Sequence, residues 1–480
     1  MSSSFEHDDV DKKEDNSPSL HSLAKVEPVG GQVAFERRTM RSVDLHIIPI
    51  LALLYAFALI DRINLGAART AGMGDALHLD IGARFSIATV LYFIPYILLQ
   101  IPGNLLVRKV GARNWLTVSV IGWGAVQLGM GWVPTWGYLT FCRVLLGGFE
   151  ASFFPAAVYI ISSWYTRYEV QKRLASLYLM SLTISGFSPI LAYALSLLDR
   201  KRNIDGWSWI FIIEGSVTLF LGIISFFLLP DFPESNTFLS QEQTALVLQR
   251  VEDDRGDSVP DQLTFKKVFK HLGDWTLWAY GLMFMCCTLP AYAIAYFISV
   301  ILKGMGWSTT AALLLSAPPY APAFFSAIFF AWLSDKKRHR AGFIVLQGLI
   351  SIVGLCLTAF APHNGARYLG IFLLNAGSSG CIPSILAYSA NNVVGASKRS
   401  ISSALTVAFG GVGGIIASTV YREQDFPRYL PGLWVTLGAQ FLLLFLVGAT
   451  SLHFARQNRL AREGRLAAPL EGQPGFFYTL

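Results

Sequence analysis

The sequence predicts an all-α membrane protein in which twelve transmembrane helices form two six-helix bundles. Three observations support this fold class. The 480 residues are 53% hydrophobic and only 14% charged, with a mean hydropathy of +0.47. Twelve apolar runs approach the roughly 20 residues that a helix needs to cross a bilayer. One long polar segment separates the first six runs from the last six. Because soluble chains carry about 25% charged residues, the composition excludes a water-soluble enzyme or nucleic-acid-binding protein.

The chain before the first apolar run is polar, and it carries the acidic residues Glu6, Asp8, Asp9 and Asp11. It lacks the apolar segment that a cleavable signal peptide has after a basic start. We expect residues 1–43 to form a disordered cytosolic tail and the first apolar run to act as an internal signal anchor.

Interruptions by proline, glycine and charge set the limits of the twelve predicted spans. The first six cover residues 45–67, 85–106, 115–133, 138–162, 174–198 and 208–230. The last six cover residues 277–302, 308–333, 342–361, 367–389, 400–421 and 431–454. We therefore assign residues 44–230 to an N-terminal bundle and residues 275–455 to a C-terminal bundle.

The polar segment 231–274 is predicted to be a cytosolic central loop. Within it, Ser240 to Gln243 has the S-x-x-Q form of a capping box, which predicts a short surface helix. Residues 456–480 are predicted to form a second cytosolic tail, whose arginines meet anionic lipid head groups. Lysine and arginine concentrate on the side of the membrane that holds both chain ends, which predicts that this side is cytosolic.

The loop after the second span of each half repeats in character. The first copy reads NLLVRKVGAR from Asn104, and the second reads AWLSDKKRHR from Ala331. Both resemble the G-x-x-x-D-R-x-G-R/K signature of the major facilitator superfamily, in which two halves rock about a central site. Neither copy is complete. Arg108 stands where the signature has Asp in the first copy, whereas Asp335 is present in the second, and the resemblance implies gating or structural roles for both.

Longer strings resemble the anion:cation symporter family, particularly its fungal allantoate and nicotinate permease-like branch. The resemblance covers essentially residues 44–455. It implies uptake of small organic anions, such as carboxylates and vitamins, together with protons. The strings are DRINLGAARTAGM from Asp61, PYILLQIPGNLL from Pro95, RVLLGGFEASFFP from Arg143, WSWIFIIEG from Trp207, LPDFPE from Leu229 and LLSAPPYAPA from Leu314.

Five ionisable residues lie within or near the spans, where each needs a partner, a wet cavity or a function. Asp61 and Arg62 end the first span, Arg143 and Glu150 lie in the fourth, and Glu214 lies early in the sixth. Arg143 and Glu150 share one helix face but are about 10 Å apart along the axis, too far to pair directly. Asp61 and Arg62 are about 100° apart around their helix, so one can face a cavity while the other meets a neighbouring helix.

A cation beside two carboxylates suits an anionic substrate and a coupling proton. Related organic-anion symporters have D-R in the first span and E-A/G-x-x-F-P in the fourth. The resemblance therefore implies that Arg62 binds the substrate carboxylate and that Asp61 and Glu150 are the proton-coupling acids. Three alternatives remain open at this point: Asp61 and Arg62 can lie at the outer interface, Arg143 can be structural, and Glu214 can be interfacial.

Tyr96 and Asn375 are further candidates for substrate contact. Packing explains the first equally well, and interhelical hydrogen bonding explains the second. No metal site or nucleophile-and-base set can be assembled from the spans, so we expect neither an enzyme nor a bound cofactor.

The leading hypothesis is a monomeric, multi-pass secondary active transporter of the plasma membrane. It imports a small organic anion with protons, and its partners are that anion and the lipid bilayer. An exporter of a secondary metabolite or drug-like compound is one alternative. A transporter-like nutrient receptor that signals without much flux is another.

Overall fold

The computed structural model describes residues 30–255, 265–337, 339–422, 425, 428–466, 468–472 and 475–480. Within these ranges the regular structure is helical throughout. Ten helical segments are long and apolar enough to cross a membrane. The consecutive helices α3 and α4 together form an eleventh span, and α5 forms a twelfth. The predicted twelve-helix fold class is confirmed. The first 29 residues of the predicted tail lie outside the described residues.

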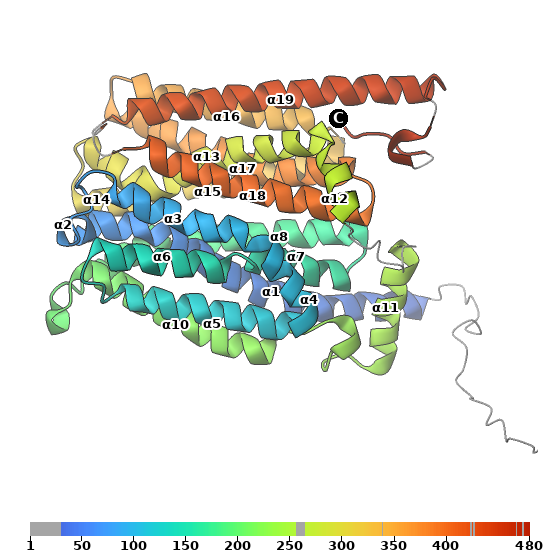
Figure 1. Cartoon of the computed structure of the whole chain (residues 1–480), viewed down its shortest axis with the longest axis horizontal. Helices are drawn as coiled ribbons and strands as arrows, with labels where there is room; N and C mark the ends of the chain where they lie inside the picture. The colour runs from blue at the N-terminus through green and yellow to red at the C-terminus, as the bar shows by residue number, and fades with distance from the viewer. Residues whose placement is uncertain are drawn as a thin grey trace, which may run out of the picture.

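Each half supplies one layer of long, nearly parallel helices, and Figure 1 shows the C-terminal layer above the N-terminal one. The N-terminal half contains α1 (Gly30–Ala68), η2 (Arg69–Met73), α2 (Gly74–Ala76), α3 (Arg84–Leu98), α4 (Gln100–Val110), α5 (Ala112–Met130), α6 (Trp136–Glu150), α7 (Phe153–Trp164), α8 (Arg167–Ser185), α9 (Ser188–Ser196), η3 (Lys201–Asn203) and α10 (Gly206–Leu228). The connection contains η4 (Pro233–Ser235), α11 (Gln241–Arg255) and α12 (Phe265–Leu272). The C-terminal half contains α13 (Trp275–Gly304), α14 (Thr309–Leu315), α15 (Tyr320–Lys337), α16 (Ala341–Phe360), α17 (Asn364–Asn392), α18 (Ala396–Val420) and α19 (Leu430–Arg462), followed by η6 (Leu470–Gly472).

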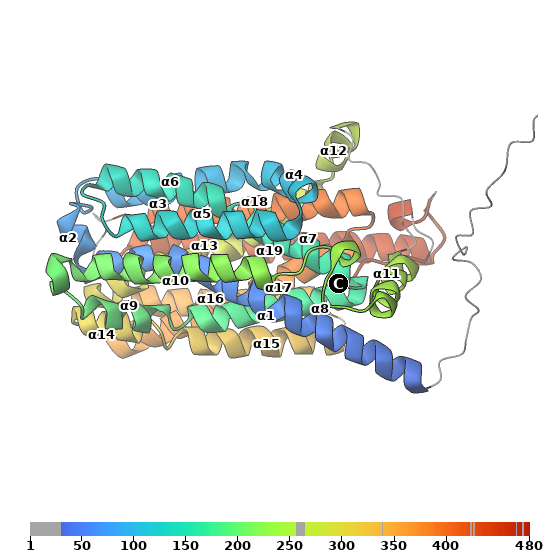
Figure 2. The ribbon, with the colours of Figure 1, turned by 90° about the horizontal axis from the view of Figure 1, so that it is seen from below.

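Figures 1 and 2 place α11 and α12 at the end of the molecule where α1 begins and α19 ends, and α2 and α14 at the opposite end. We call these the terminal end and the distal end. The predicted capping box of α11 is confirmed: the Gln243 amide donates to the Ser240 hydroxyl at 3.3 Å, and the Ser240 amide donates to Gln243 Oε1 at 3.1 Å. The central segment also contacts the N-terminal half, because Arg250 of α11 forms ion pairs with Glu36 of α1 and with Glu169, near the start of α8.

Four predicted spans are each broken into two helices: α3 and α4, α6 and α7, α8 and α9, and α14 and α15. Proline explains the breaks, since it lacks an amide donor and clashes with the preceding helical turn. Pro102, Pro155 and Pro189 each lie in the first turn of a second helix, and Pro319 immediately precedes α15. The breaks shorten the straight helices without interrupting the spans.

Both ends of the transmembrane region differ from prediction. Residues 30–43 are helical rather than disordered, because α1 starts at Gly30 and already buries Met40 and Val43. The last helix continues through Arg462, well into the predicted tail. The chain after it then folds back onto the C-terminal half, where the Tyr478 amide donates to Asn458 Oδ1 at 2.9 Å. These contacts hold the end of the described chain against the C-terminal half.

The hydrophobic core is divided unequally between the two ends. One cluster of buried side chains joins both halves and includes Tyr296, Phe297 and Leu302 from the distal part of α13. A second cluster contains buried side chains of the C-terminal half alone, including Leu277 and Met283 from the terminal part of α13. The halves therefore share a core toward the distal end and have separate cores toward the terminal end.

Candidate functional site

Arg62 lies in the last third of α1, where it joins three helices. Its side chain is buried and forms an ion pair with Glu150 at the end of α6. A second guanidinium nitrogen, Nη1, donates a hydrogen bond to the Tyr292 hydroxyl of α13 at 2.8 Å. Since α13 belongs to the C-terminal half, these contacts connect the two halves.

Aromatic rings surround this ion pair. The guanidinium carbon of Arg62 lies 5.4, 5.0 and 5.8 Å from the ring centroids of Tyr92, Tyr96 and Tyr292. The Tyr92 hydroxyl donates to the second carboxylate oxygen of Glu150 at 2.6 Å. Ring faces attract a cation and exclude water from it, which strengthens its electrostatic interactions. We call these five residues the Arg62 cluster.

A second polar group lies deeper in the N-terminal half. Asp61 turns away from Arg62 and accepts a hydrogen bond from the Thr218 hydroxyl of α10 at 3.1 Å. It lies within electrostatic range of both Arg143 and Glu214. The guanidinium carbon of Arg143 lies 4.8 Å from the centroid of the Tyr92 ring, so this tyrosine contacts both clusters. We call Asp61, Arg143 and Glu214 the Asp61 cluster.

All five ionisable residues singled out in the sequence are buried. The exposed fractions are 1% for Asp61, 4% for Arg62, 0% for Arg143, 3% for Glu150 and 1% for Glu214. Their burial does not fit the alternatives in which Asp61 and Arg62, or Glu214, face water at the membrane interface. Neighbouring helices cover them, and for Arg62 these include α13 of the other half. As predicted, Asp61 and Arg62 face different helices, and Glu150 meets partners beyond its own helix.

The remaining candidates lie in different parts of the molecule. Tyr96 belongs to the Arg62 cluster. The side chain of Asn375 forms hydrogen bonds within the C-terminal half. Its amide nitrogen donates to the Pro319 carbonyl at 3.0 Å, and its oxygen accepts from the Ser379 hydroxyl at 3.0 Å. That arrangement favours interhelical hydrogen bonding for Asn375. Arg108 lies near the end of α4 and Asp335 near the end of α15, and their side chains fall outside the described residues.

Sequence reasoning missed Tyr92 and Tyr292, the two hydroxyl groups that contact the ion pair directly. A signal was present. Tyr92 and Tyr96 are four residues apart on α3, and Tyr292 and Tyr296 are four residues apart on α13, so each pair lies on one helix face. Two such pairs in spans of different halves point to an aromatic site between the halves.

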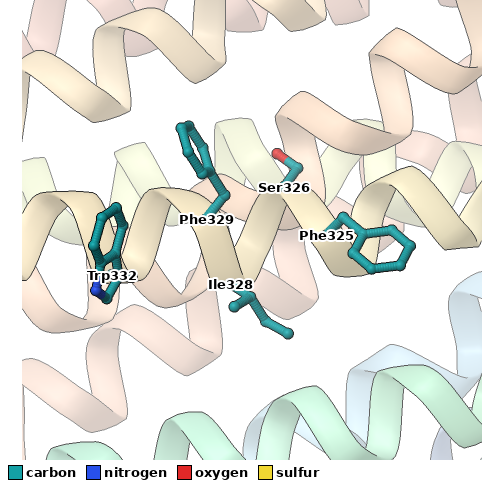
Figure 3. Close-up of a pocket in the computed structure, with 5 residues that line it drawn as sticks. All are labelled: Phe325, Ser326, Ile328, Phe329 and Trp332. Carbon is teal, nitrogen blue, oxygen red and sulfur yellow. The ribbon is translucent and has the colours of Figure 1, made fainter.

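The hollow drawn in Figure 3 is a different feature. Its lining comes from a single helix, α15, and most of that lining is exposed in the absence of lipid. An apolar exposed face on a spanning helix is the surface expected to contact lipid tails. The lining residues are Phe325, Ser326, Ile328, Phe329 and Trp332.

Residues 51–418 match the family model of the Major Facilitator Superfamily. The chain belongs to this superfamily. A fungal relative described as "MFS transporter prlL" is 30% identical over 443 residues, covering 90% of this chain and 89% of the relative. The high-affinity nicotinic acid transporter of Saccharomyces cerevisiae is 26% identical, and the match covers 88% of this chain and 79% of that protein.

Solved structures of major facilitator proteins have the same fold. The proton:xylose symporter XylE, bound to 6-bromo-6-deoxy-D-glucose, superposes with a TM-score of 0.67 at 13% identity, covering 84% of this chain and 95% of that one. A bacterial homolog of the human lysosomal transporter Spinster, in an inward-facing and occupied conformation, gives a TM-score of 0.65 at 14% identity, with coverage of 85% and 97%.

Membership in the major facilitator superfamily makes the chain a multi-pass membrane transporter of small molecules rather than an enzyme. In such proteins the substrate site lies where the two halves meet, near the middle of the bilayer. The Arg62 cluster lies where the halves meet, because α1, α3 and α6 contribute from one half and α13 from the other. The candidate site is therefore the Arg62 cluster.

Proposed function

We propose that this chain is a proton-coupled symporter that imports a small organic anion by alternating access. Both chain ends would lie in the cytosol, and the membrane would be the plasma membrane. The observation that carries the proposal is the ion pair between Arg62 and Glu150, which lies where the two halves meet. An arginine that binds carboxylates with two parallel hydrogen bonds suits a carboxylate substrate.

The coupling follows from competition for one cation. As long as Glu150 is ionised, it occupies the guanidinium that a substrate carboxylate would need. When Glu150 takes up a proton it loses its charge, and the freed Arg62 can then pair with the anion. Substrate and proton therefore bind together, because either one alone leaves an unbalanced charge in a poorly solvated site.

Tyrosine side chains would support this exchange. The Tyr292 hydroxyl already accepts from Arg62, so it keeps one guanidinium nitrogen in place while the other changes partner. Tyr92 and Tyr96 offer ring faces against which a flat, conjugated anion can stack. This preference for a flat carboxylate agrees with the nicotinic acid named for the yeast relative, so an aromatic monocarboxylate is the first substrate to try.

Uptake of labelled nicotinate into proteoliposomes, alongside a panel of aliphatic carboxylates and neutral sugars, tests the proposal. An inward proton gradient should drive accumulation of at least one carboxylate and of no sugar. Arg62→Lys should weaken that uptake by at least about tenfold, because lysine lacks the two-pronged geometry. Accumulation that ignores the proton gradient would refute the coupling.

Glu150→Gln separates coupling from folding. Glutamine is neutral, like the protonated acid, so Arg62 should remain available to the anion. The variant should exchange substrate across the membrane at equal pH but should not concentrate it when a gradient is imposed. Gradient-driven accumulation in Glu150→Gln would remove Glu150 from the mechanism.

A further inference from the structure

Glu214, like Asp61, is a buried acid that the proposed exchange at Arg62 does not use. It lies on α10 and is 1% exposed, and neither of its carboxyl oxygens has a hydrogen-bond partner among the described residues. The next residue, Gly215, packs so closely against α5 that a Cβ added there would collide with the backbone of Leu128. Protein therefore encloses both Glu214 and the residue that follows it.

Few charged groups face Glu214 from the elements packed against α10. From α1 comes Asp61, which interacts with Glu214 electrostatically. Neither α9 nor the part of α5 near Glu214 carries a charged side chain. The cation of η2, Arg69, forms an ion pair with Asp80. Arg143 of α6 is the next cation among the described residues. It interacts electrostatically with Asp61, which in turn interacts with Glu214.

The charges of the Asp61 cluster therefore do not balance if both acids are ionised. Arg62 and Glu150 neutralise each other in the neighbouring cluster, which leaves two carboxyl groups and one guanidinium. An isolated carboxylate in a dry interior is so unfavourable that the group takes up a proton instead. Asp61 accepts a hydrogen bond from Thr218, whereas Glu214 accepts none from a described residue, so the proton belongs on Glu214 in the resting state.

We propose that Asp61 and Glu214 together hold a single exchangeable proton, forming a second proton site in the core of the N-terminal half. Transfer moves the proton from the Glu214 carboxyl group to a carboxylate oxygen of Asp61, which leaves Glu214 ionised and changes no other bond. Arg143 links the pair to the Arg62 cluster, because the Tyr92 ring beneath it donates to Glu150 through its hydroxyl. Any role of this proton in transport rests on the proposed function. The protonation of the pair does not.

Infrared spectroscopy of the purified full chain in lipid nanodiscs tests the proton count directly. The wild type should show a protonated-carboxyl C=O band at neutral pH that shifts on exchange into D2O. Glu214→Gln should lose that band, because Asp61 then balances Arg143. Asp61→Asn should lose it as well, since Glu214 must then ionise to balance the same arginine. A band of unchanged intensity in either folded variant would overturn the proposal.

Two further variants should increase the band or leave it unchanged. Arg143→Gln removes the cation, so both acids should be protonated and the band should roughly double in area; an unchanged area counts against the shared proton. Glu242→Gln is the control, because Glu242 is an exposed acid of α11 outside both clusters, and its loss should leave the band intact. The band is read without substrate, so it distinguishes failure of this inference from failure of proton-coupled uptake.

Discussion

The two buried arginines differ in how their charges are satisfied. Arg62 makes directional contacts, an ion pair to Glu150 and a hydrogen bond to Tyr292. Arg143 lies over the Tyr92 ring, and its guanidinium has no hydrogen-bond partner among the described residues. Directional contacts can be exchanged for those of a substrate carboxylate, whereas Arg143 acts mainly through its charge on Asp61. The difference supports the proposals that Arg62 binds the substrate and that Arg143 balances the charge of the Asp61 cluster.

Replacing Tyr292 by Phe tests the contact from the C-terminal half. The change removes the hydroxyl that accepts from Arg62 and keeps the ring. Loss of a hydrogen bond to a charged group should weaken substrate affinity by about fivefold or more, on the order of 1 kcal/mol. Substrate binding is measured by calorimetry on the purified protein.

Tyr296→Phe is the matched control for this prediction. Tyr296 lies one turn further along α13, stacked on Tyr292, and its hydroxyl has no hydrogen-bond partner among the described residues. Affinity should be unchanged in this variant. Equal losses in the two variants would show that the ring environment, rather than the hydroxyl contact, determines binding.

The sequence predicted which charged residues lie within the spans but not how they pair. Buried ionisable residues stand out against apolar spans, so Asp61, Arg62 and Glu150 could be named from the sequence. Their partners could not, because spacing along one helix does not determine which face of another helix it meets. The contact between Arg62 and Tyr292 joins residues 230 positions apart. Long-range pairings of this kind require the packed structure.

At the scale of helices, hydropathy predicted the spans but not their breaks or their continuation into the tails. An average over about 20 residues does not detect a single proline, so the division of α8 from α9 before Pro189 was missed. Hydropathy is equally unable to show that the polar segment before residue 44 continues α1 as a helix. Contacts with the rest of the molecule, such as the ion pair between Arg250 and Glu36, stabilise that extension.

Close contact between α18 and α3 depends on glycine. A Cβ added at Gly414 would collide with the ring of Phe93, and Phe93 itself contacts Tyr292 and Tyr96 of the Arg62 cluster. Gly414→Ala should therefore separate the halves beside the site and reduce the uptake rate by at least about tenfold, since overpacking costs about 1–3 kcal/mol. Initial uptake rates in proteoliposomes measure the effect.

Gly438→Ala in α19 controls for the general effect of alanine in a membrane helix. No neighbouring atom lies within 4 Å of a Cβ at Gly438. The variant should transport like the wild type, and its helix should be slightly more stable because alanine favours helix more than glycine does. Wild-type uptake by Gly414→Ala would show that the α18–α3 contact is not needed for transport.

The folded-back C-terminal segment is held by a cluster of charges at the terminal end. Lys398 lies 2.7 Å from a carboxylate oxygen of Asp274 and 2.7 Å from one of Glu471. Partial burial alone would raise the pKa of Asp274, but hydrogen bonds from Lys398 and Thr276 outweigh it and lower this pKa. Partial burial would lower the pKa of Lys398, but its bonds to Asp274 and Glu471 outweigh that effect and raise it.

These shifts determine how the segment responds to pH. The contribution of Asp274 is complete above its unfolded pKa, about 3.9, and is lost as pH falls through the lower folded value. The contribution of Lys398 is complete below its unfolded pKa, about 10.4, and is lost as pH rises through the higher folded value. Thermal unfolding in detergent should therefore show a constant contribution from this contact across neutral pH.

Lys398→Met should release the segment. It leaves Asp274 and Glu471 without their cation, which should destabilise the docked state by about 1–3 kcal/mol. Hydrogen exchange at the amides of Tyr478 and Thr479, which donate to Asn458 and Asn392, reports the release. Lys398→Arg keeps the charge and should retain most of the protection. Unchanged exchange in the methionine variant would show that the asparagine contacts suffice.

At the scale of the whole molecule, the distribution of the core indicates which end is closed. The halves share buried side chains toward the distal end, where Phe85 of α3 meets Phe297 of α13 with ring centroids 5.7 Å apart. Gly66 of α1 also touches the backbone of Tyr296 so closely that a Cβ would collide with it. Alternating access requires these distal contacts to separate when the site opens to that end.

A disulfide across the distal contact should stop that separation. The hydroxyls of Thr70 and Ser299, from opposite halves, lie 2.9 Å apart, so sulfur atoms at these positions can approach the S–S bond length of about 2.05 Å. In the double variant Thr70→Cys, Ser299→Cys, oxidation should abolish uptake, and a reducing agent should restore it. Each single variant controls for the five native cysteines. The locked protein should still bind substrate offered from the terminal end in detergent, because the Arg62 cluster is unchanged. Full uptake by the oxidised, crosslinked protein would show that the distal contact does not open during transport.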